Sequence, residues 1–201
     1  QRRTSIGAKL AMHYLNTTGP RMNRFMHQLM VNVGYRLQSR GSQLTRKLVP
    51  NRLLSKIPGS TTGTIKLGQQ LVPFMANPLP IPKPAKTLRA LIECEDGGFI
   101  PIIKANPEHL DPKAQSIPTV FYFPGCGSEK LFSDIGLATL FLLSELGVQT
   151  VLPAGYVCCG YPQKANGQPG LAKQINTDNR VLFHRMASSL THLEIKNVIV
   201  S

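Results

Sequence analysis

The sequence predicts an α/β protein. Its C-terminal half is expected to hold a parallel βαβαβ sheet flanked by helices, preceded by a basic, mainly helical N-terminal region and a small β-hairpin. Three observations support this prediction. From Thr119 onward, short apolar runs alternate with longer helical patterns. Near the N-terminus, apolar residues recur at steps of three and four. The excess of basic charge lies entirely in the first half of the 201 residues.

Charge divides the chain sharply. Residues 1–92 contain 15 Lys and Arg and no Asp or Glu, whereas residues 93–201 contain 8 basic and 10 acidic residues. The two parts therefore carry +15 and −2. We expect two regions with different partners.

Residues 1–57 are expected to form a basic helical region. Pro20 suits the first turn of a helix, and Gly41-Ser42 is expected to end it. The apolar residues of this helix fall on one face, which we expect to pack against another domain. They are Met22, Phe25, Met26, Leu29, Met30, Val33 and Leu37.

Two short regions connect this part to the C-terminal half. Residues 58–86 form a Pro-rich linker, because alternating prolines exclude both a helix and a central strand. Residues 87–118 are expected to form a β-hairpin and a loop. Leu88, Ala90, Ile92 and Cys94 occupy alternate positions, as in a strand whose side chains point alternately inward and outward, and Asp96-Gly97-Gly98 is a turn signal.

Residues 119–201 predict the parallel sheet. Apolar strands are expected at 119–123, 148–152 and 197–201, with helices over 131–146 and 170–190 between them. Both ends of the sequence look like cuts within a longer protein, so we expect further cysteines after the third strand.

The cysteines are the strongest functional signal in the sequence. Cys126 follows the first strand, and Cys158 and Cys159 follow the second. Loops at the carboxyl ends of neighbouring parallel strands share one edge, so three thiols can converge there. Thiolate ligands suit iron–sulfur clusters and zinc. Adjacent cysteines depart from the usual Cys-x₂₋₄-Cys pairs of zinc sites, which favours iron–sulfur.

Other interpretations of the cysteines remain open at this point. Cys158 and Cys159 could form a vicinal dithiol redox pair, zinc could replace iron, or the thiols could be simple buried residues. Cys94, in an alternating pattern, is expected to be a buried apolar residue. The histidines show no zinc-site spacing, and no nucleotide-binding or hydrolase motif occurs, so the chain is not expected to be catalytic alone.

The spacing Cys-x₃₁-Cys-Cys-Gly-x-Pro resembles the cysteine-rich CCG domain family. This family occurs in the B subunit of heterodisulfide reductase, in the anaerobic glycerol-3-phosphate dehydrogenase C subunit, and in glycolate oxidase and lactate-utilisation iron–sulfur subunits. The resemblance covers residues 119–201. In the family a Cys-x-x-Cys follows, which would lie beyond Ser201.

The resemblance implies a function and a ligand set. It implies an iron–sulfur electron-transfer module of a flavin-linked hydroxy-acid dehydrogenase or oxidase, with a [4Fe–4S] or non-cubane cluster and with FAD in an upstream domain or subunit. Electrons would pass to a quinone or another carrier. The implied ligands are Cys126, Cys158 and Cys159. Gly125, Gly127 and Gly160 would allow close approach of the cluster, and Pro162 would fix the loop.

A second functional hypothesis concerns the basic N-terminal half. It could dock on an acidic subunit or an anionic membrane surface. Nucleic acid is not an expected partner, because few aromatic side chains interrupt the basic residues and no binding motif occurs. No apolar run approaches the roughly 20 residues of a membrane span. We expect a cytoplasmic protein, or one peripheral to the inner membrane.

Overall fold

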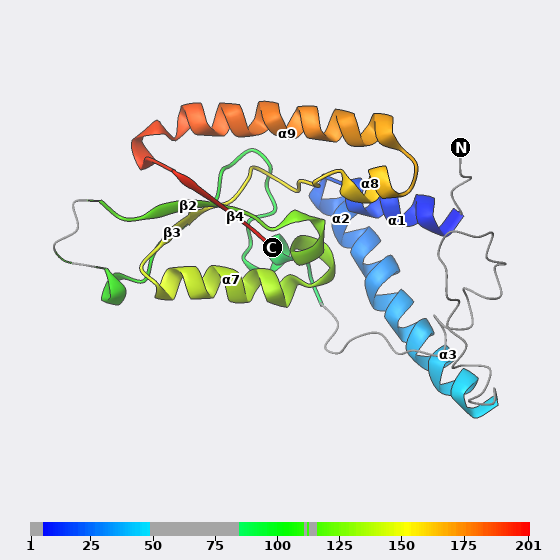
Figure 1. Ribbon diagram of the computed structural model, residues 1–201. Coiled ribbons are helices and arrows are strands. Elements are labelled where there is room, and N and C mark those ends of the chain that lie inside the picture. Colours follow the sequence, from blue (N-terminus) through cyan, green and yellow to red (C-terminus); the bar gives the residue numbers. More distant parts are fainter. Residues whose placement is uncertain (1–5, 49–84, 111, 113–115) are drawn as a thin grey trace. The chain divides into compact units, whose positions relative to one another are not determined.

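The computed structural model describes residues 6–48, 85–110, 112 and 116–201 (Figure 1). Residues 6–27 and 85–201 belong to one compact unit, and residues 28–48 belong to a second. Most of the predicted linker, residues 58–86, lies outside the described residues. All the predicted site residues lie in the first unit.

A four-stranded sheet organises the first unit. Its strands are β1 (Ile102–Ile103), β2 (Thr119–Phe123), β3 (Gln149–Val151) and β4 (Asn197–Val200), in the order β1-β3-β2-β4. Both β3 and β4 run parallel to β2, as predicted. However, β1 pairs antiparallel with β3. The sheet is therefore mixed, and the purely parallel arrangement holds only for its other three strands.

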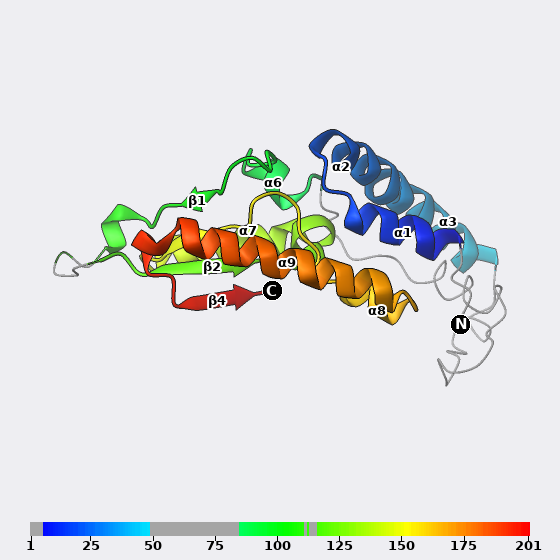
Figure 2. The same ribbon diagram turned by 90° about the horizontal axis from the view of Figure 1, so that it is seen from above.

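Helices cover the two faces of this sheet. Helix α7 (Ser133–Glu145) joins β2 to β3, and helix α9 (Pro169–Ser189) precedes β4. The two helices run on opposite sides of the strands (Figures 1 and 2). Successive residues of β2 alternate between these faces. Phe121 and Phe123 pack toward α9, whereas Tyr122 packs toward α7.

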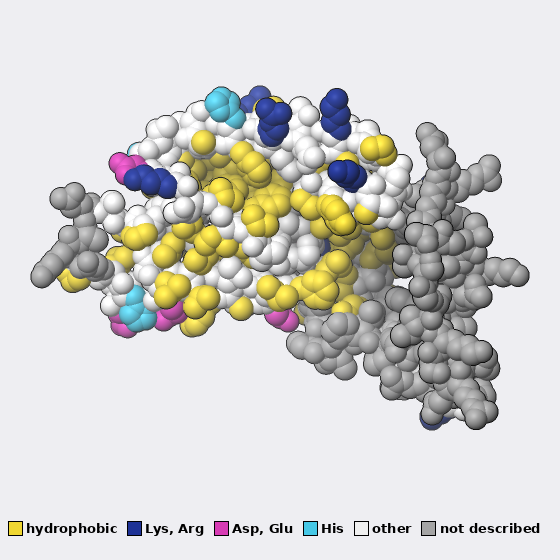
Figure 3. Space-filling model, in the orientation of Figure 1, with side chains coloured by type: hydrophobic (Ala, Val, Ile, Leu, Met, Phe, Trp, Pro, Cys, Tyr) yellow, Lys and Arg dark blue, Asp and Glu magenta, His cyan; other side chains and the backbone are white. Residues whose placement is uncertain are grey.

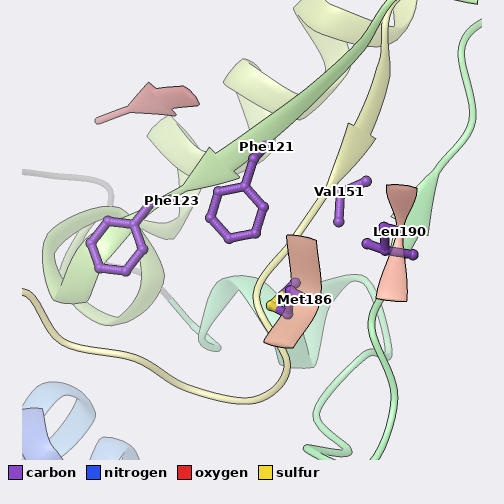
Figure 4. Packing of buried hydrophobic residues seen from close by; sticks show 5 residues of the cluster. All are labelled: Phe121, Phe123, Val151, Met186 and Leu190. Atoms are coloured by element: carbon purple, nitrogen blue, oxygen red, sulfur yellow. The ribbon is translucent and has the colours of Figure 1, made fainter. Parts of the chain in front are cut away.

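The core on the α9 side is aromatic at its centre. Phe121, Phe123 and Val151 of the strands meet Met186 and Leu190 at the end of α9 (Figure 4). Phe183 of α9 adds edge-to-face contacts, with ring centroids 5.2 Å from Phe121 and 5.7 Å from Phe123. These are favourable aromatic geometries. They fix where α9 lies along β2.

The predicted hairpin over residues 87–104 is wrong. Residues Leu88–Leu91 form a short helix, α6, and only Ile102–Ile103 is a strand. Thr87 caps this helix, because its hydroxyl accepts a hydrogen bond from the Ala90 N–H. The apolar residues of this segment pack as part of a helix and its flank, not as a strand. Leu88 is fully buried against Tyr122 in the core between the sheet and α7, and Ile92 is partly buried beside that core.

The N-terminal residues are helical, as predicted. In the first unit, α1 spans Ile6–Asn16 and α2 spans Pro20–His27, beginning at the expected proline. In the second unit, a π-helical segment, Gln28–Val33, is followed by α3 (Gly34–Leu48). Helix α3 continues through Gly41-Ser42, so the predicted stop there is wrong. None of the helices in the described part of the chain is both long and apolar enough to cross a membrane.

In these N-terminal helices, most of the apolar residues that were expected to be buried are exposed, and polar residues are buried instead. The buried side chains are mainly polar, and include Asn23 and His27 in the first unit and Gln38 and Ser42 in the second. The predicted apolar face is largely exposed; only Met26 of it is fully buried, and Met30 is partly covered. The exposed members are Met22, Phe25, Leu29, Val33 and Leu37.

Candidate metal centre

The candidate site lies at the carboxyl ends of β2 and β3. The chain leaves β2 toward α7 and leaves β3 toward α9, on the opposite face. In open α/β sheets, ligands usually bind outside adjacent strand ends whose connections diverge in this way. Cys126 follows β2, and Cys158 follows β3. The topology thus places both cysteines at one rim.

The structure brings Cys126 and Cys158 together. A hydrogen bond between their side chains is the largest cause of the pKa shift of each thiol, and Cys158 is buried whereas Cys126 is half-buried. The bond from Cys126 lowers the pKa of Cys158 to about 6, against the opposing effect of burial, and the Gly160 N–H and Gln163 amide add to it. The pKa of Cys126 rises because its thiol donates that bond and is buried. One proton held between two sulfurs accounts for the opposite directions.

Cys159 and Cys94 are placed differently. Cys159 is exposed, and its charge raises the pKa of Cys126, so it lies near the pair without being packed into it. Cys94 is half-buried, and its N–H donates to the Arg89 carbonyl at 2.8 Å. All four cysteines are free thiols. In the described part of the chain, no three His, Cys, Asp or Glu side chains are arranged to hold a metal ion.

The backbone around Cys158 is held by glycine and by α9. Gly160 has φ +78°, and a Cβ there would lie 3.1 Å from the Ala172 carbonyl oxygen. Asn179 of α9 donates to the Cys158 carbonyl at 2.8 Å. Pro162 lies in the first turn of α8 (Tyr161–Ala165), so it fixes the chain immediately after Gly160. Helix α9 therefore supports the loop that carries Cys158.

The loop that carries Cys126 turns sharply. Gly125 has φ +59°, in the left-handed region, whereas Gly127 has open space around it. A π-helical turn, Gly127–Leu131, follows, closed by the Phe132 N–H on the Gly127 carbonyl at 2.9 Å. Such turns are frequent at functional sites. The wide turn buries both Glu129 and Lys130, which are 1% exposed.

Lys130 is a buried cation that the sequence analysis did not identify. Its ammonium donates to the carbonyls of Tyr14, Leu15 and Thr17 at 2.9, 3.1 and 2.8 Å. It also lies 5.2 Å from the ring centre of Tyr14 and 5.3 Å from that of Tyr156. Burial lowers the pKa of Lys130 to about 8, opposed by the charges of Glu129, Cys158 and Cys126.

Arg89 and Glu129 form a second buried charged pair. Arg89 Nε lies 3.3 Å from Glu129 Oε2, although without hydrogen-bond alignment, and the Arg89 N–H donates to Glu129 Oε1 at 3.0 Å. The guanidinium also donates to the Pro153 carbonyl at 2.7 Å. Burial raises the pKa of Glu129 and lowers that of Arg89, and each group opposes the shift of the other.

Neither buried charge was predicted. In sequence, Glu129-Lys130 resembles a solvated pair at the start of a helix. The one sequence signal for this burial is that the pair follows Pro-Gly-Cys at the carboxyl end of a predicted strand, where ligands usually bind in α/β sheets. Gln163 was missed for the same reason: it is fully buried and touches the Cys158 sulfur at 3.7 Å.

The donor set fits an iron–sulfur group in kind. Two thiols converge at adjacent strand ends and a third lies next to them. The Gln163 amide contacts the Cys158 sulfur, and the buried Lys130 charge is near enough to act on Cys158 and Cys126, so both groups would complement thiolate charge. Cys126, Cys158 and Cys159 are thus candidates for sulfur ligands by chemical type, although the described residues do not arrange three such side chains around one point.

A mixed α/β sheet with thiols gathered at one carboxyl edge defines a cysteine-rich α/β module. Comparison with protein families agrees: residues 120–191 match the family described as CCG, cysteine-rich domain. The similarity to that family is therefore shown for this segment of the chain. The resemblance noted from the cysteine spacing is confirmed for this segment.

Three relatives illustrate the similarity. An uncharacterized iron–sulfur protein of Methanocaldococcus jannaschii is 26% identical over 49% of this chain and 19% of its own length. The B subunit of fumarate reductase (CoM/CoB) from Methanothermobacter marburgensis is 31% identical over 41% of this chain and 15% of its own length. Lactate utilization protein A from an Exiguobacterium species is 37% identical over 29% of this chain and 24% of its own length.

The chain spans no more than a quarter of the length of these relatives. No solved structure matches it.

Proposed function

We propose that the chain supplies Cys126, Cys158 and Cys159 as thiolate ligands of an iron–sulfur centre in an electron-transfer module. The parent activity would be a flavin-linked dehydrogenase or oxidase for a small hydroxy acid, with electrons passing to a quinone or another carrier. The observation that carries the proposal is the meeting of Cys126 and Cys158, 32 residues apart in sequence, at adjacent strand ends.

The comparisons support an iron–sulfur redox module. The family match covers all three cysteines, and each of the relatives described above is an iron–sulfur protein or a named redox or lactate-utilisation component. The hydroxy-acid substrate follows from the lactate-utilisation relative and from the family resemblance. The flavin partner, which would be a separate domain or subunit, rests on the resemblance alone.

The residues of the chain have distinct tasks in this proposal. An iron–sulfur group supplies one-electron transfer when bound. Cys126 and Cys158 hold it from two strand ends, and exposed Cys159 adds a ligand from the solvent side. Gly160 lets the loop pass close to α9, and α9 holds that loop through Asn179. Buried Gln163 contacts the Cys158 sulfur and would complement its charge.

Anaerobic reconstitution of the full chain with iron and sulfide tests the proposal. Cys126→Ser and Cys158→Ser should each lower bound iron and acid-labile sulfide several-fold, and Cys159→Ser should do the same. Cys94→Ser is the matched control. It should bind as much iron and sulfide as the wild type, since Cys94 lies in the segment whose backbone is bonded to Arg89 and is not one of the proposed ligands. Binding of zinc without sulfide, or equal losses in Cys94→Ser and Cys158→Ser, would contradict the proposal.

A second candidate function is docking of the basic N-terminal half on an anionic surface, either lipid or an acidic subunit. The favouring observation is the second unit's α3, which exposes Leu37 (65%) and Leu44 (59%) together with Arg36 and Arg40. An exposed apolar stripe flanked by basic residues is typical of interfacial helices.

Co-sedimentation with vesicles tests this second candidate. The full chain should sediment with vesicles that contain anionic lipid and remain free with zwitterionic ones, and Leu37→Glu should weaken the binding. Equal behaviour with both vesicle types would exclude the lipid surface and leave the acidic subunit as the remaining partner of this kind.

A further inference from the structure

The C-terminal end of α1 contacts two buried polar side chains, Lys130 and Gln163, and Gln163 in turn touches the Cys158 sulfur. Its carbonyls hold the Lys130 ammonium, and its last residue, Asn16, accepts a hydrogen bond from the Gln163 amide through Oδ1. Lys130 and Gln163 come from different loops, one after β2 and one after β3. Helix α1 lies outside the segment that matches the cysteine-rich family.

The contacts of Lys130 show that it carries a charge. Three carbonyl oxygens at 2.8–3.1 Å surround Nζ. An ammonium has three N–H donors to fill these acceptors, whereas a neutral amine has two. The last carbonyls of a helix also carry the negative end of its dipole, which favours a cation there. This cation acts on both Cys126 and Cys158.

The Gln163 amide can act directly on the Cys158 sulfur. Both Oε1 and Nε2 lie 3.7 Å from Sγ, so the amide accepts from a thiol or donates to a thiolate. An amide NH₂ has two N–H groups. One points to Asn16, which leaves the other for the sulfur. Asn16 therefore fixes which end of the amide faces Cys158 when the sulfur is a thiolate.

We propose that α1 belongs to the metal centre: its C-terminal end fixes the Lys130 charge close enough to act on the cysteines and holds the Gln163 amide against the Cys158 sulfur, and thereby raises the reduction potential of the bound iron–sulfur group. This inference rests on the proposed function. Reduction adds negative charge to the group, and a fixed cation and an N–H···S hydrogen bond stabilise that charge. Lys130 and Gln163 are positioning and tuning residues, and the ligands remain the cysteines.

A purely structural role for α1 leaves the choice of residues unexplained. Burial of an ammonium is costly, and an apolar side chain of similar size would fill the same space without that cost. Gln163 is fully buried as well, although its neighbours Tyr161 and Lys164 on α8 are exposed. The Gln163 amide touches the Cys158 sulfur and the Lys130 charge acts on the same cysteine, which packing alone does not require.

The test is a redox titration of the reconstituted full chain, followed by electron paramagnetic resonance. Lys130→Met should make reduction about tenfold less favourable, a midpoint about 59 mV more negative for one electron. Lys130→Arg, which keeps the charge, should stay close to the wild type. Gln163→Leu should shift the midpoint in the same direction as Lys130→Met. Asn166→Ala is the matched control, since Asn166 contacts Met12 of α1 but no cysteine.

Asn16→Ala supplies a variant remote from the sulfurs. It should lower the midpoint by a smaller amount than Gln163→Leu, and it should add nothing in the Gln163→Leu background, because it acts through that amide. Hydrogen exchange of residues 6–16 in the metal-free protein shows whether α1 remains docked in each variant. A docked α1 with a shifted midpoint supports the inference.

The two proposals fail in different ways. If wild type and variants bind iron and sulfide equally and all midpoints coincide, α1 has no tuning role and the metal centre stands. If the wild type binds no iron and sulfide at all, the proposed function fails and the inference falls with it. If Lys130→Met does not fold, Asn16→Ala and Gln163→Leu decide the question.

Discussion

At the scale of single residues, the site depends on side chains whose surroundings differ from what their type suggests. Lys130 and Gln163 are polar, yet they are 1% and 0% exposed, and Gln163 contacts the Cys158 sulfur. The meeting of Cys126 and Cys158 at the sheet edge could be predicted, because loops after neighbouring parallel strands share one edge. The buried polar residues could not, since a charge in a sequence carries no sign of the carbonyls that will surround it.

Gly160 provides the first prediction. Gly160→Ala should lower the free energy of unfolding by about 2–3 kcal/mol, since a left-handed residue with a Cβ costs roughly 1–2 kcal/mol and this Cβ also meets a carbonyl. The Ala172 oxygen lies 3.1 Å from that Cβ position. Gly167→Ala is the matched control, with φ +75° and no atom within 4 Å.

Urea denaturation of both variants measures the difference. Gly167→Ala should cost only the roughly 1–2 kcal/mol of the backbone conformation. If the two glycine variants lose the same stability, the close approach of the Cys158 loop to α9 is not a source of strain.

At the scale of elements, the sequence predicted the alternation from β2 to β4 correctly, because continuous apolar strands separated by amphipathic helices have few solutions. It failed at residues 87–104. There, a period-two pattern of four residues was too short to distinguish a strand from a single helical turn. Thr87 decided the outcome through its cap on α6. The buried face of α2 was also predicted incorrectly from its apolar residues, because the polar side chains of Asn23 and His27 are buried.

The docking of α9 gives the second prediction. Phe183→Leu should destabilise the protein by about 1–2 kcal/mol, because it removes two edge-to-face ring contacts while keeping most of the buried volume. Val181→Ala on the same helix is the control. Val181 is 45% exposed and should change stability by less than about 0.5 kcal/mol. Thermal unfolding followed by circular dichroism measures both; a larger loss in Val181→Ala would show that α9 packs through a different face.

At the scale of the whole molecule, distant segments meet in the first unit. Residues near Tyr14, Arg89, Lys130 and Tyr156 come from four parts of the chain and share one buried polar cluster. No local pattern could have predicted this convergence, because each contact spans tens to more than a hundred residues. The charge asymmetry, by contrast, was visible in the sequence and separates the basic N-terminal part from the cysteine-rich segment.

The Arg89–Glu129 pair gives the third prediction, because it joins α6 to the turn after β2. Glu129→Gln should cost about 3–5 kcal/mol, since it leaves a fully buried guanidinium without a counter-charge. Arg24→Gln is the control. It breaks a contact of 2.7 Å with Glu95, but Arg24 is 66% exposed, so about 1 kcal/mol or less is expected. Similar losses in guanidinium chloride would show that Glu129 does not neutralise Arg89.

β4 is an edge strand of the described sheet, and its free edge affects how the protein behaves at high concentration. Apolar side chains gather on the face of the first unit between α9 and α7 (Figure 3), and Val198 and Val200 of β4 are 64% and 67% exposed. Within the described residues β4 pairs only with β2, so its other side offers main-chain donors and acceptors to any extended peptide. Concentrated samples should self-associate by adding strand to strand there, and Val198→Lys should keep the protein monodisperse in light scattering.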